Sequence, residues 1–181
     1  VPSGRQEWVF LKPPVPSEVA PPYDDRLVIS AVEKQVFFRS FGEWIVVFDS
    51  QLQRKIMGQF ATGVTIITMS NGGETWGMTA NAVTSVSLDP PLVLVCVETG
   101  NQTHPQLTEA GCFAMNILSA EQKELSDRFA FTGPKDCSGL EVSTAATGAP
   151  ILPGTLGYVD CQVRQVVTAG DHDIFLGEIG A

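Results

Sequence analysis

The sequence predicts a mainly β fold with short helices, in the form of a β-barrel that carries the helices. Strand-like segments recur at short spacing, and only three short helical segments lie among them. Because strands and helices do not alternate one for one, a parallel sheet of βαβ units is not expected. The chain has 181 residues, 44% of them hydrophobic, which is enough to bury a substantial core.

The amino-terminal part differs in composition from the rest of the chain. Residues 1–25 hold six of the twelve prolines, which favours an extended arm. Residues 27–48 are rich in β-branched and aromatic residues and predict strands. The strands expected there are 27–29, 35–38 and 44–48. We therefore divide the chain near Asp49 into an amino-terminal extension, residues 1–48, and a main domain, residues 49–181.

Short helices are predicted where Ser or Thr is followed three residues later by Gln, the pattern of a capping box. The three pairs are Ser50 and Gln53, Thr103 and Gln106, and Ser119 and Gln122. Glycine favours the left-handed conformation that ends many helices. The expected helix ends are Gly63, Gly111 and, for the third helix, about Ala130.

The remaining apolar segments predict strands, because they are β-branched, alternate with polar residues or form short apolar runs. They are residues 64–69, 75–79, 92–97, 112–118, 157–167 and 172–179. Asn71-Gly72-Gly73 predicts a hairpin turn between the first two. Residues 131–153, rich in Gly, Pro, Ser and Thr, predict a surface loop, a common place for a lid or a substrate contact.

Charge and cysteine usage narrow the class of protein. The formal net charge of −9 and the isoelectric point near 4.6 argue against a nucleic-acid partner, which needs clustered Lys and Arg. No apolar run reaches the ~18 residues of a membrane span, and the amino terminus lacks a signal-peptide pattern. The four cysteines are dispersed without a C-x-x-C pair or a zinc-ligand spacing. We therefore expect a protein of the reducing cytoplasm, with no membrane partner and no metal site.

The most informative segment is the polar run from Gly77 to Leu92, which ends in a Pro-Pro turn. Its small residues allow a flat ligand to approach the backbone, and its hydroxyl and amide side chains can bind a polar edge or a phosphate. Those donors are Thr79, Asn81, Thr84, Ser85 and Ser87. Taken alone, the segment favours an ordinary β-hairpin whose hydroxyls cap turns. No G-x-G-x-x-G or P-loop motif is present, so another nucleotide fold is not indicated.

Four ordered blocks give the chain a resemblance to the flavin reductase family of two-component monooxygenases. That family carries Met-Gly-x-Phe-x-Thr-Gly-Val-Thr, T-A-N-S-x-T-S-V-S-L-D-P-P-L, R-T-H-P and G-D-H-x-I-F-x-G-E-V. The corresponding blocks here are residues 57–65, 79–92, 101–105 and 170–179. Together they extend over about residues 50–181, so the chain resembles the family across its whole main domain.

The resemblance implies an FMN-binding split β-barrel, a homodimer, and hydride transfer from NADH or NADPH to FMN or FAD. It also implies the residues of the flavin site. These are Thr79, Ala80, Asn81, Ala82, Val83, Thr84, Ser85 and Ser87 along the ring and ribityl chain, and Gln102 and Thr103 at the phosphate. His172 would lie at the nicotinamide as the catalytic residue. No protein nucleophile is needed, because the flavin accepts the hydride.

Each of these residues has a simpler interpretation. Thr103 is equally a helix N-cap, which is compatible with a phosphate contact. His172 is equally a surface residue at the start of a strand. We expect His104 to be structural or exposed, and Trp76 to pack in the core or an interface rather than stack on flavin.

The chain departs from the family pattern at two positions of the site. Gln102 stands where arginine is frequent, which removes a fixed positive charge from the expected phosphate site. Either flavin binds weakly or another cation compensates. The candidates are Arg54, Lys55, Lys123, Arg128 and a side chain of a partner subunit. Ala82 replaces a frequent serine, so only its backbone can bind a ligand.

A third departure concerns the last strand. The family usually continues past the position of Ala181 to a Phe-Phe-Arg-Gly-Arg-Tyr-like strand, and Val36-Phe37-Phe38-Arg39 resembles it. Residues 35–48 are therefore either a displaced barrel strand or an unrelated extension.

The resulting functional prediction is an NAD(P)H-dependent flavin reductase that supplies reduced flavin to a partner monooxygenase. Two alternatives stay open: a split-barrel flavoprotein that keeps its FMN and reduces another acceptor, and a non-catalytic flavin-binding protein.

Overall fold

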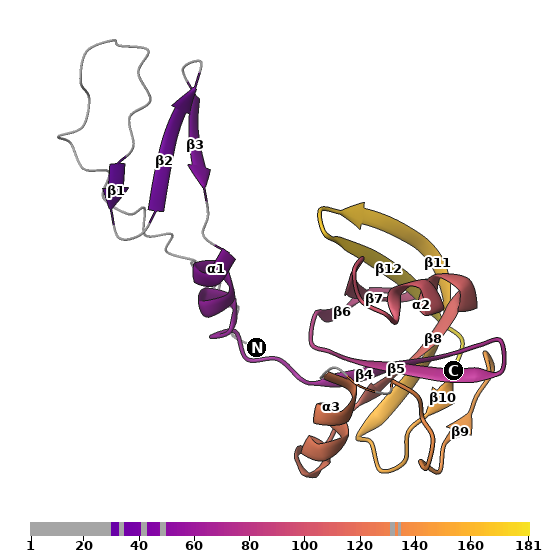
Figure 1. The fold of residues 1–181 in the computed structure, drawn as a ribbon. Helices are drawn as coiled ribbons and strands as arrows, with labels where there is room; N and C mark the ends of the chain where they lie inside the picture. The colour runs from indigo at the N-terminus through magenta and orange to yellow at the C-terminus, as the bar shows by residue number, and fades with distance from the viewer. Residues whose placement is uncertain (1–29, 33–34, 41–42, 48–49, 131–132, 134) are drawn as a thin grey trace, which may run out of the picture. The chain divides into compact units, whose positions relative to one another are not determined.

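The computed structural model describes residues 30–32, 35–40, 43–47, 50–130, 133 and 135–181 (Figure 1). The chain forms two compact units, Val1–Phe60 and Ala61–Ala181. We describe each unit by itself. No helix in the described ranges is long and apolar enough to cross a membrane.

The first unit holds a small antiparallel sheet and one helix. Its strands pair in the order β1 (Ser30–Val32), β2 (Gln35–Ser40) and β3 (Glu43–Val47). The two later strands confirm the strands expected from 35 and 44, whereas the strand expected at 27–29 lies outside the described residues. β2, the candidate displaced strand, pairs with β1 and β3.

Helix α1 (Ser50–Met57) begins where its capping pair predicts but ends before the expected Gly63. Gly58 explains the difference, because glycine is a poor helix former. The Gly58 N–H still donates to the Arg54 carbonyl at 2.8 Å, whereas the N–H of Gln59 bonds only three residues back, to Ile56. The prediction of a helix extending through Phe60 is therefore wrong.

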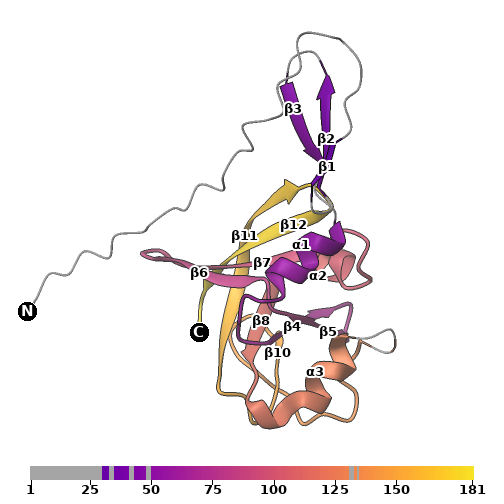
Figure 2. The same ribbon diagram turned by 90° about the vertical axis from the view of Figure 1, so that its left-hand side faces the viewer.

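The second unit is built on one seven-stranded antiparallel sheet, which confirms the predicted mainly β class. Its strand order is β5-β4-β8-β11-β12-β7-β6. The bounds are β4 (Thr65–Asn71), β5 (Glu74–Ala80), β6 (Val83–Leu88), β7 (Pro91–Glu98), β8 (Cys112–Ile117), β11 (Gly157–Ala169) and β12 (His172–Ile179). The long β11–β12 hairpin curves across the sheet (Figure 2). All six strands predicted in the main domain are confirmed.

The polar run does not form a hairpin of its own. β5 ends at Ala80 and β6 begins at Val83, but β6 pairs with β7, with Val83 opposite Val95 and Thr84 opposite Leu94. The sheet order ends at β6, so among the described strands β6 pairs on one side only, with β7. The interpretation of Thr79 to Ser87 as an ordinary hairpin is therefore wrong.

Two helices pack on this sheet. α2 (His104–Ala110) packs mainly against β4, and α3 (Lys123–Ala130) packs against β5 (Figures 1 and 2). α2 ends at Gly111, whose φ of 63° is the left-handed conformation expected for it. α3 follows a single 3-10 turn, Ala120–Gln122, where the Ser119 N–H donates to Gln122 Oε1 at 3.0 Å. Both predicted helix ends are confirmed.

The predicted surface loop after α3 is only partly irregular. Its described residues include two short paired strands, β9 (Ser143–Thr144) and β10 (Pro150–Ile151). Near them, the buried Asn116 side chain joins separate segments. Asn116 Nδ2 donates to the Ile66 carbonyl at 3.1 Å, and its Oδ1 accepts from the Leu152 N–H at 2.9 Å. This amide therefore ties the segment after β10 to the sheet.

Two glycines allow close packing of aromatic rings against the sheet. A Cβ at Gly77 would lie 2.7 Å from Phe129 on α3, and one at Gly177 would lie 2.6 Å from Phe113. Both phenylalanines are essentially fully buried. The rings therefore sit directly on the backbone of β5 and β12, a position that any side chain there would block.

Candidate functional site

The sequence-predicted flavin residues lie at the end of β5, in the following loop and along β6. Thr79 is partly buried, and its hydroxyl donates to the Ser126 carbonyl of α3 at 2.6 Å. Ala80 belongs to the buried core, whereas Asn81 and Ala82 are exposed. The loop thus presents one amide and one methyl side chain to solvent, while Thr79 fixes the neighbouring strand to α3.

Along β6 the hydroxyl side chains are accessible. Thr84 and Ser85 are exposed, and the Thr84 hydroxyl makes only a long local contact to the Ser85 carbonyl at 3.2 Å. The Ser87 hydroxyl accepts from the Asp89 N–H at 3.2 Å within the β6–β7 turn. Val83 packs against the core. Donors that hold no short internal bond are available to a ligand, so Thr84 and Ser85 fit the polar edge of a flavin.

The structure brings Thr103 to the start of α2, but its side chain does not cap the helix. Thr103 is fully buried, and both its N–H and its hydroxyl donate to Asn101 Oδ1, at 2.9 and 2.7 Å. Gln106 does not complete a capping box, because its Oε1 accepts from Asn71 instead. Thr103 therefore lies at the predicted N-cap position, but the predicted capping box with Gln106 is wrong. Asn101 organises this turn, a role that the sequence reasoning missed although Asn commonly bonds a backbone N–H two residues on.

The two histidines have different surroundings. His172 begins β12 with its side chain 44% exposed, and its Nδ1 lies 2.7 Å from Asp171 Oδ1. His104 is mostly buried, with its Nε2 2.8 Å from Asp173 Oδ2 and its ring edge-on to Phe175. Of the two environments expected for His104, structural or exposed, the structure shows the structural one. His172 is the accessible imidazole of the pair.

The hydrogen bond between His104 and Asp173 predicts an acid-dependent stability. The hydrogen bond from His104 holds the pKa of Asp173 below its usual range. A carboxyl whose pKa is lowered by folding stabilises the protein above its unfolded pKa, and this contribution is lost as the pH falls through the folded pKa. We expect Asp173→Asn to lower the midpoint of thermal unfolding at pH 7, with the difference shrinking below about pH 4.

His104→Leu is the matched control, because it removes the hydrogen-bond partner of Asp173 and leaves the carboxyl. In that background the Asp173→Asn effect at pH 7 should be smaller. An equal offset between parent and Asp173→Asn at every pH would contradict the assignment.

A cavity of about 560 Å³ opens beside the edge strand β5. Gln102 lines it from the turn before α2, and Trp76 lines it from β5. The other lining residues are Gly73, Glu74, Thr75, Gly133, Lys135, Asp136, Cys137, Ser138 and Val142. Of the predicted site residues, Gln102 alone is among them, so the structure places the expected phosphate end beside a sizeable cavity.

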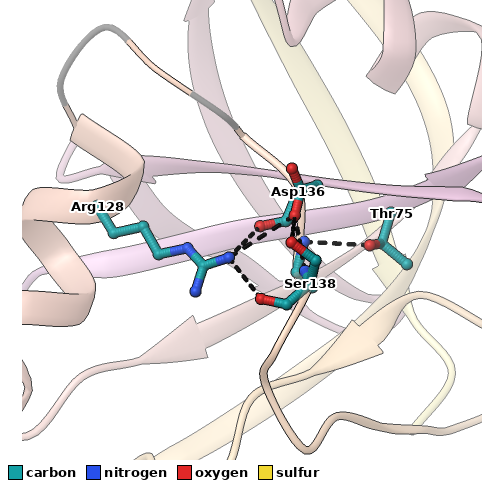
Figure 3. A network of polar contacts seen from close by, with 5 residues as sticks. Thr75, Arg128, Asp136 and Ser138 are labelled. Carbon is teal, nitrogen blue, oxygen red and sulfur yellow. Dashed lines mark hydrogen bonds and ion pairs between the residues drawn. The ribbon is translucent and has the colours of Figure 1, made fainter.

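A polar network fixes one wall of this cavity (Figure 3). Arg128 Nη2 donates to the carbonyls of Asp136 and Ser138, at 3.0 and 2.8 Å. The Cys137 N–H donates to Thr75 Oγ1 at 3.1 Å. Hydrogen bonds from Ser138, with the nearby Arg128, hold the pKa of Asp136 below its usual range, so this carboxyl is ionised at neutral pH. The network therefore ties this segment to α3 and β5, and the charge of Asp136 is offset by the Arg128 guanidinium at 3.7 Å.

Lys135 is a cavity residue that the sequence reasoning missed. Its side chain is buried, and its Nζ donates to the Phe129 carbonyl near the end of α3 at 2.6 Å. Burial lowers the pKa of Lys135. Four cations of this chain are candidates to replace the positive charge that is missing at Gln102. Of these, Arg128 bonds Asp136 and Ser138, and Lys123 pairs with Asp127 on α3. Arg54 and Lys55 belong to the first unit.

The comparisons with known proteins agree on one family. A family model for the flavin reductase like domain matches residues 57–181. A probable flavin reductase of Rhizobium meliloti is 40% identical over 136 residues, which are 75% of this chain and 44% of that protein. The chain spans about half the length of the first curated relatives that it matches.

Solved structures give the same result. BorF, the flavin reductase component of a bacterial two-component tryptophan halogenase, is 40% identical with a TM-score of 0.69, over 74% of this chain and 86% of BorF. The NADH:FAD oxidoreductase SgcE6 of Streptomyces globisporus, in complex with NAD and FAD fragments, is 37% identical with a TM-score of 0.69, over 74% and 81% of the two chains. From residue 57 onward, the chain belongs to the flavin reductase family and has its split-barrel fold.

Proposed function

We propose that this chain is an NAD(P)H:flavin oxidoreductase that reduces FMN or FAD and passes the reduced flavin to a partner monooxygenase. The observation that carries the proposal is the run from Thr79 to Ser87. In this run an exposed loop of small side chains leads into a strand whose hydroxyls face solvent. A flat ring with a polar edge fits such a surface, since close backbone approach and free donors are both available.

Bound flavin supplies the hydride-accepting chemistry, so the chain needs only to bind and orient its two ligands. Asn81, Ala82 and the backbone of Val83 line the ring. Thr84 and Ser85 hydrogen-bond its polar edge or the ribityl chain, and Ser87 lies nearby. Thr79 positions this surface through its bond to α3, and Ala80 through its place in the core.

His172 is the proposed residue at the nicotinamide. Its imidazole is partly exposed at the β11–β12 turn, and Asp171 fixes the orientation of the ring through Nδ1. The second ring nitrogen is then available to the carboxamide or to a phosphate of the nicotinamide nucleotide.

The phosphate end of the flavin is assigned to the turn at Gln102 and Thr103. Both donors of Thr103 are already bound by Asn101, so we assign the direct contact to the exposed Gln102 amide and the shape of the turn to Thr103. A neutral amide binds phosphate less strongly than the arginine of the family pattern. Weak binding suits a reductase that releases its flavin as a product.

The relatives support the choice of ligands and partner. SgcE6 is named an NADH:FAD oxidoreductase, and BorF is the reductase component of a two-component system. We therefore assign NADH as the first nicotinamide to test and a flavin-dependent oxygenase or halogenase as the class of partner.

We further propose a homodimer in the cytoplasm. Apolar side chains are exposed on the second unit, with Leu88 91%, Val86 47% and Val166 44% exposed, as expected for a surface that a second copy covers. All four cysteines are free thiols, which fits a reducing compartment. Residues 1–48 are assigned as an extension that precedes the reductase domain at 49–181.

Flavin dependence separates this proposal from a flavoprotein with resident FMN. After desalting, the protein should retain little visible flavin absorbance, and its NADH oxidation should require added FMN or FAD. Flavin that stays bound through desalting, with turnover of another acceptor in its absence, would favour the flavoprotein alternative.

Two substitutions should separate the flavin site from the nicotinamide site. Thr84→Val removes a hydroxyl at constant volume, so we expect the Kd for flavin to rise about fivefold to tenfold with little change in the KM for NADH. His172→Ala should raise the KM for NADH about tenfold with little change in the flavin Kd. Each variant is the control for the other, and unchanged constants in both would remove these assignments.

A further inference from the structure

The cavity beside β5 has the size and lining of a small-ligand site, and none of its described lining residues is assigned to the flavin ring or the nicotinamide. Its volume of about 560 Å³ lies within the ~300–1,000 Å³ of typical ligand pockets. The lining combines one indole, one amide, two carboxylates, two hydroxyls and one buried ammonium group. Such a lining fits a polar ligand that also has a flat apolar part.

Trp76 gives the cavity its single aromatic side chain among the described lining residues. Its indole Nε1 is buried and has no hydrogen-bond partner among the described residues. An indole N–H is a donor only, and a buried donor without an acceptor costs about 1–3 kcal/mol. The side chain also packs partly against the core, which fixes the ring in place. Because Nε1 itself is buried, a ligand in the cavity contacts the rest of the indole, and a planar group fits that contact.

The charges in the cavity favour hydroxyl and amino groups over phosphate. Glu74 lines it from the β4–β5 turn, and the ionised Asp136 lines it from the opposite segment. Carboxylates accept hydrogen bonds from ribose hydroxyls and from an exocyclic amino group. Among the described lining residues Lys135 is the single basic one, and its ammonium group already donates to the Phe129 carbonyl. Arg128 offsets the charge of Asp136, so the carboxylate of Glu74 is the acceptor that forms no ion pair among the described residues, and no described cation of the lining is left for a phosphate.

The position of the cavity links it to the phosphate end of the proposed flavin site. Gln102 lines the cavity and directly precedes Thr103 in the turn assigned to the flavin phosphate. A nucleoside joined through a diphosphate to that position would therefore enter the cavity. The wall formed by Arg128, Asp136 and Ser138 is held by hydrogen bonds already in place, so little ordering is needed on binding (Figure 3).

We propose that this cavity binds the adenosine group of an adenine dinucleotide that lacks a 2′-phosphate. This step rests on the proposed function, which supplies two sources of that group, FAD and NADH. Glu74 and Asp136 accept from the ribose or the adenine amino group, and Trp76 contacts the adenine ring. The site then discriminates FAD from FMN, or NADH from NADPH, through a group that takes no part in hydride transfer.

The test measures binding and turnover separately in the full chain. FAD and FMN affinities are obtained from quenching of flavin fluorescence, and KM values for NADH and NADPH from turnover with saturating FMN. In Glu74→Gln we expect the affinity for the adenosine source to fall about tenfold, with FMN affinity unchanged. Ser138→Phe narrows the cavity from an exposed position. It should likewise lower the affinity for the adenosine source and leave the FMN affinity unchanged. Glu141→Gln is the matched control, since Glu141 lies on the same segment but outside the lining.

The two sources give different results. If FAD is the source, the parent binds FAD at least tenfold tighter than FMN, and the variants remove that difference. If NADH is the source, FAD and FMN bind alike, adenosine competes with NADH, and the variants raise the KM for NADH. Equal FAD and FMN affinities together with an unchanged KM for NADH in both variants would overturn the proposal. FMN reduction by the parent protein is measured separately from ligand binding. A parent that does not reduce FMN would refute the proposed function and not the adenosine site.

Discussion

Replacing Gly177 by alanine is expected to destabilise the second unit by about 3 kcal/mol, the upper part of the range for overpacked cores. The added Cβ would lie 2.6 Å from Phe113 Cζ and 2.9 Å from Cys161 Cβ. Phe113 and Cys161 are both fully buried in the main core, so neither can move away without displacing other side chains. Urea unfolding of the variant should therefore show a lower midpoint with an unchanged slope.

Gly157→Ala is the matched control for this experiment. Gly157 also lies in a strand of the same sheet, and a Cβ there meets no atom within 4 Å. We expect this change to be neutral or slightly stabilising, because alanine loses less backbone entropy on folding than glycine does. Equal effects of the two substitutions would contradict the account of close packing between Phe113 and β12.

Replacing Asn116 by alanine is expected to cost about 3 kcal/mol as well, for a different physical reason. The amide is fully buried and bonds the Ile66 carbonyl, Thr68 Oγ1 and the Leu152 N–H, at 3.1, 2.9 and 2.9 Å. Truncation leaves the buried N–H of Leu152 without an acceptor and opens a void beside β4. Thermal unfolding should report the loss.

A surface amide provides the comparison. Asn71 Nδ2 donates to Gln106 and Glu109 on α2 from a less buried position, so Asn71→Ala should cost about 1 kcal/mol or less. If Asn116→Ala were no more harmful than Asn71→Ala, the Asn116 network would not hold the segment after β10 on the sheet.

Most of the sheet could be predicted from the sequence, because its strands have the local patterns that burial requires. β7 is a continuous apolar run, and β11 alternates through Val159, Cys161 and Val163. β6 is the exception. Among the described strands it pairs on one side only, and it presents Thr84 and Ser85 to solvent, so its sequence lacks the alternation of a half-buried strand. The same exposure that hid the strand makes it suitable for a ligand.

The cavity could not be predicted, because its residues come together only through the tertiary fold. Trp76 is on β5, Gln102 precedes α2, and Lys135 follows α3. Their sequence separation gives no motif. The Asn101 turn was missed for another reason: the pair of Thr103 and Gln106 satisfied a helix-start pattern, but Gln106 bonds Asn71 and Thr103 bonds Asn101. A local pattern cannot reveal such competing partners.

The central claim is that this chain transfers hydride from a nicotinamide nucleotide to flavin. The most direct measurement mixes the purified protein with NADH and FAD, and separately with FMN, under anaerobic conditions, and follows both visible flavin absorbance and NADH absorbance. The account predicts that flavin bleaches as NADH is consumed, in equal amounts and at a rate proportional to protein concentration. Flavin that stays oxidised with saturating NADH and with saturating NADPH would contradict it.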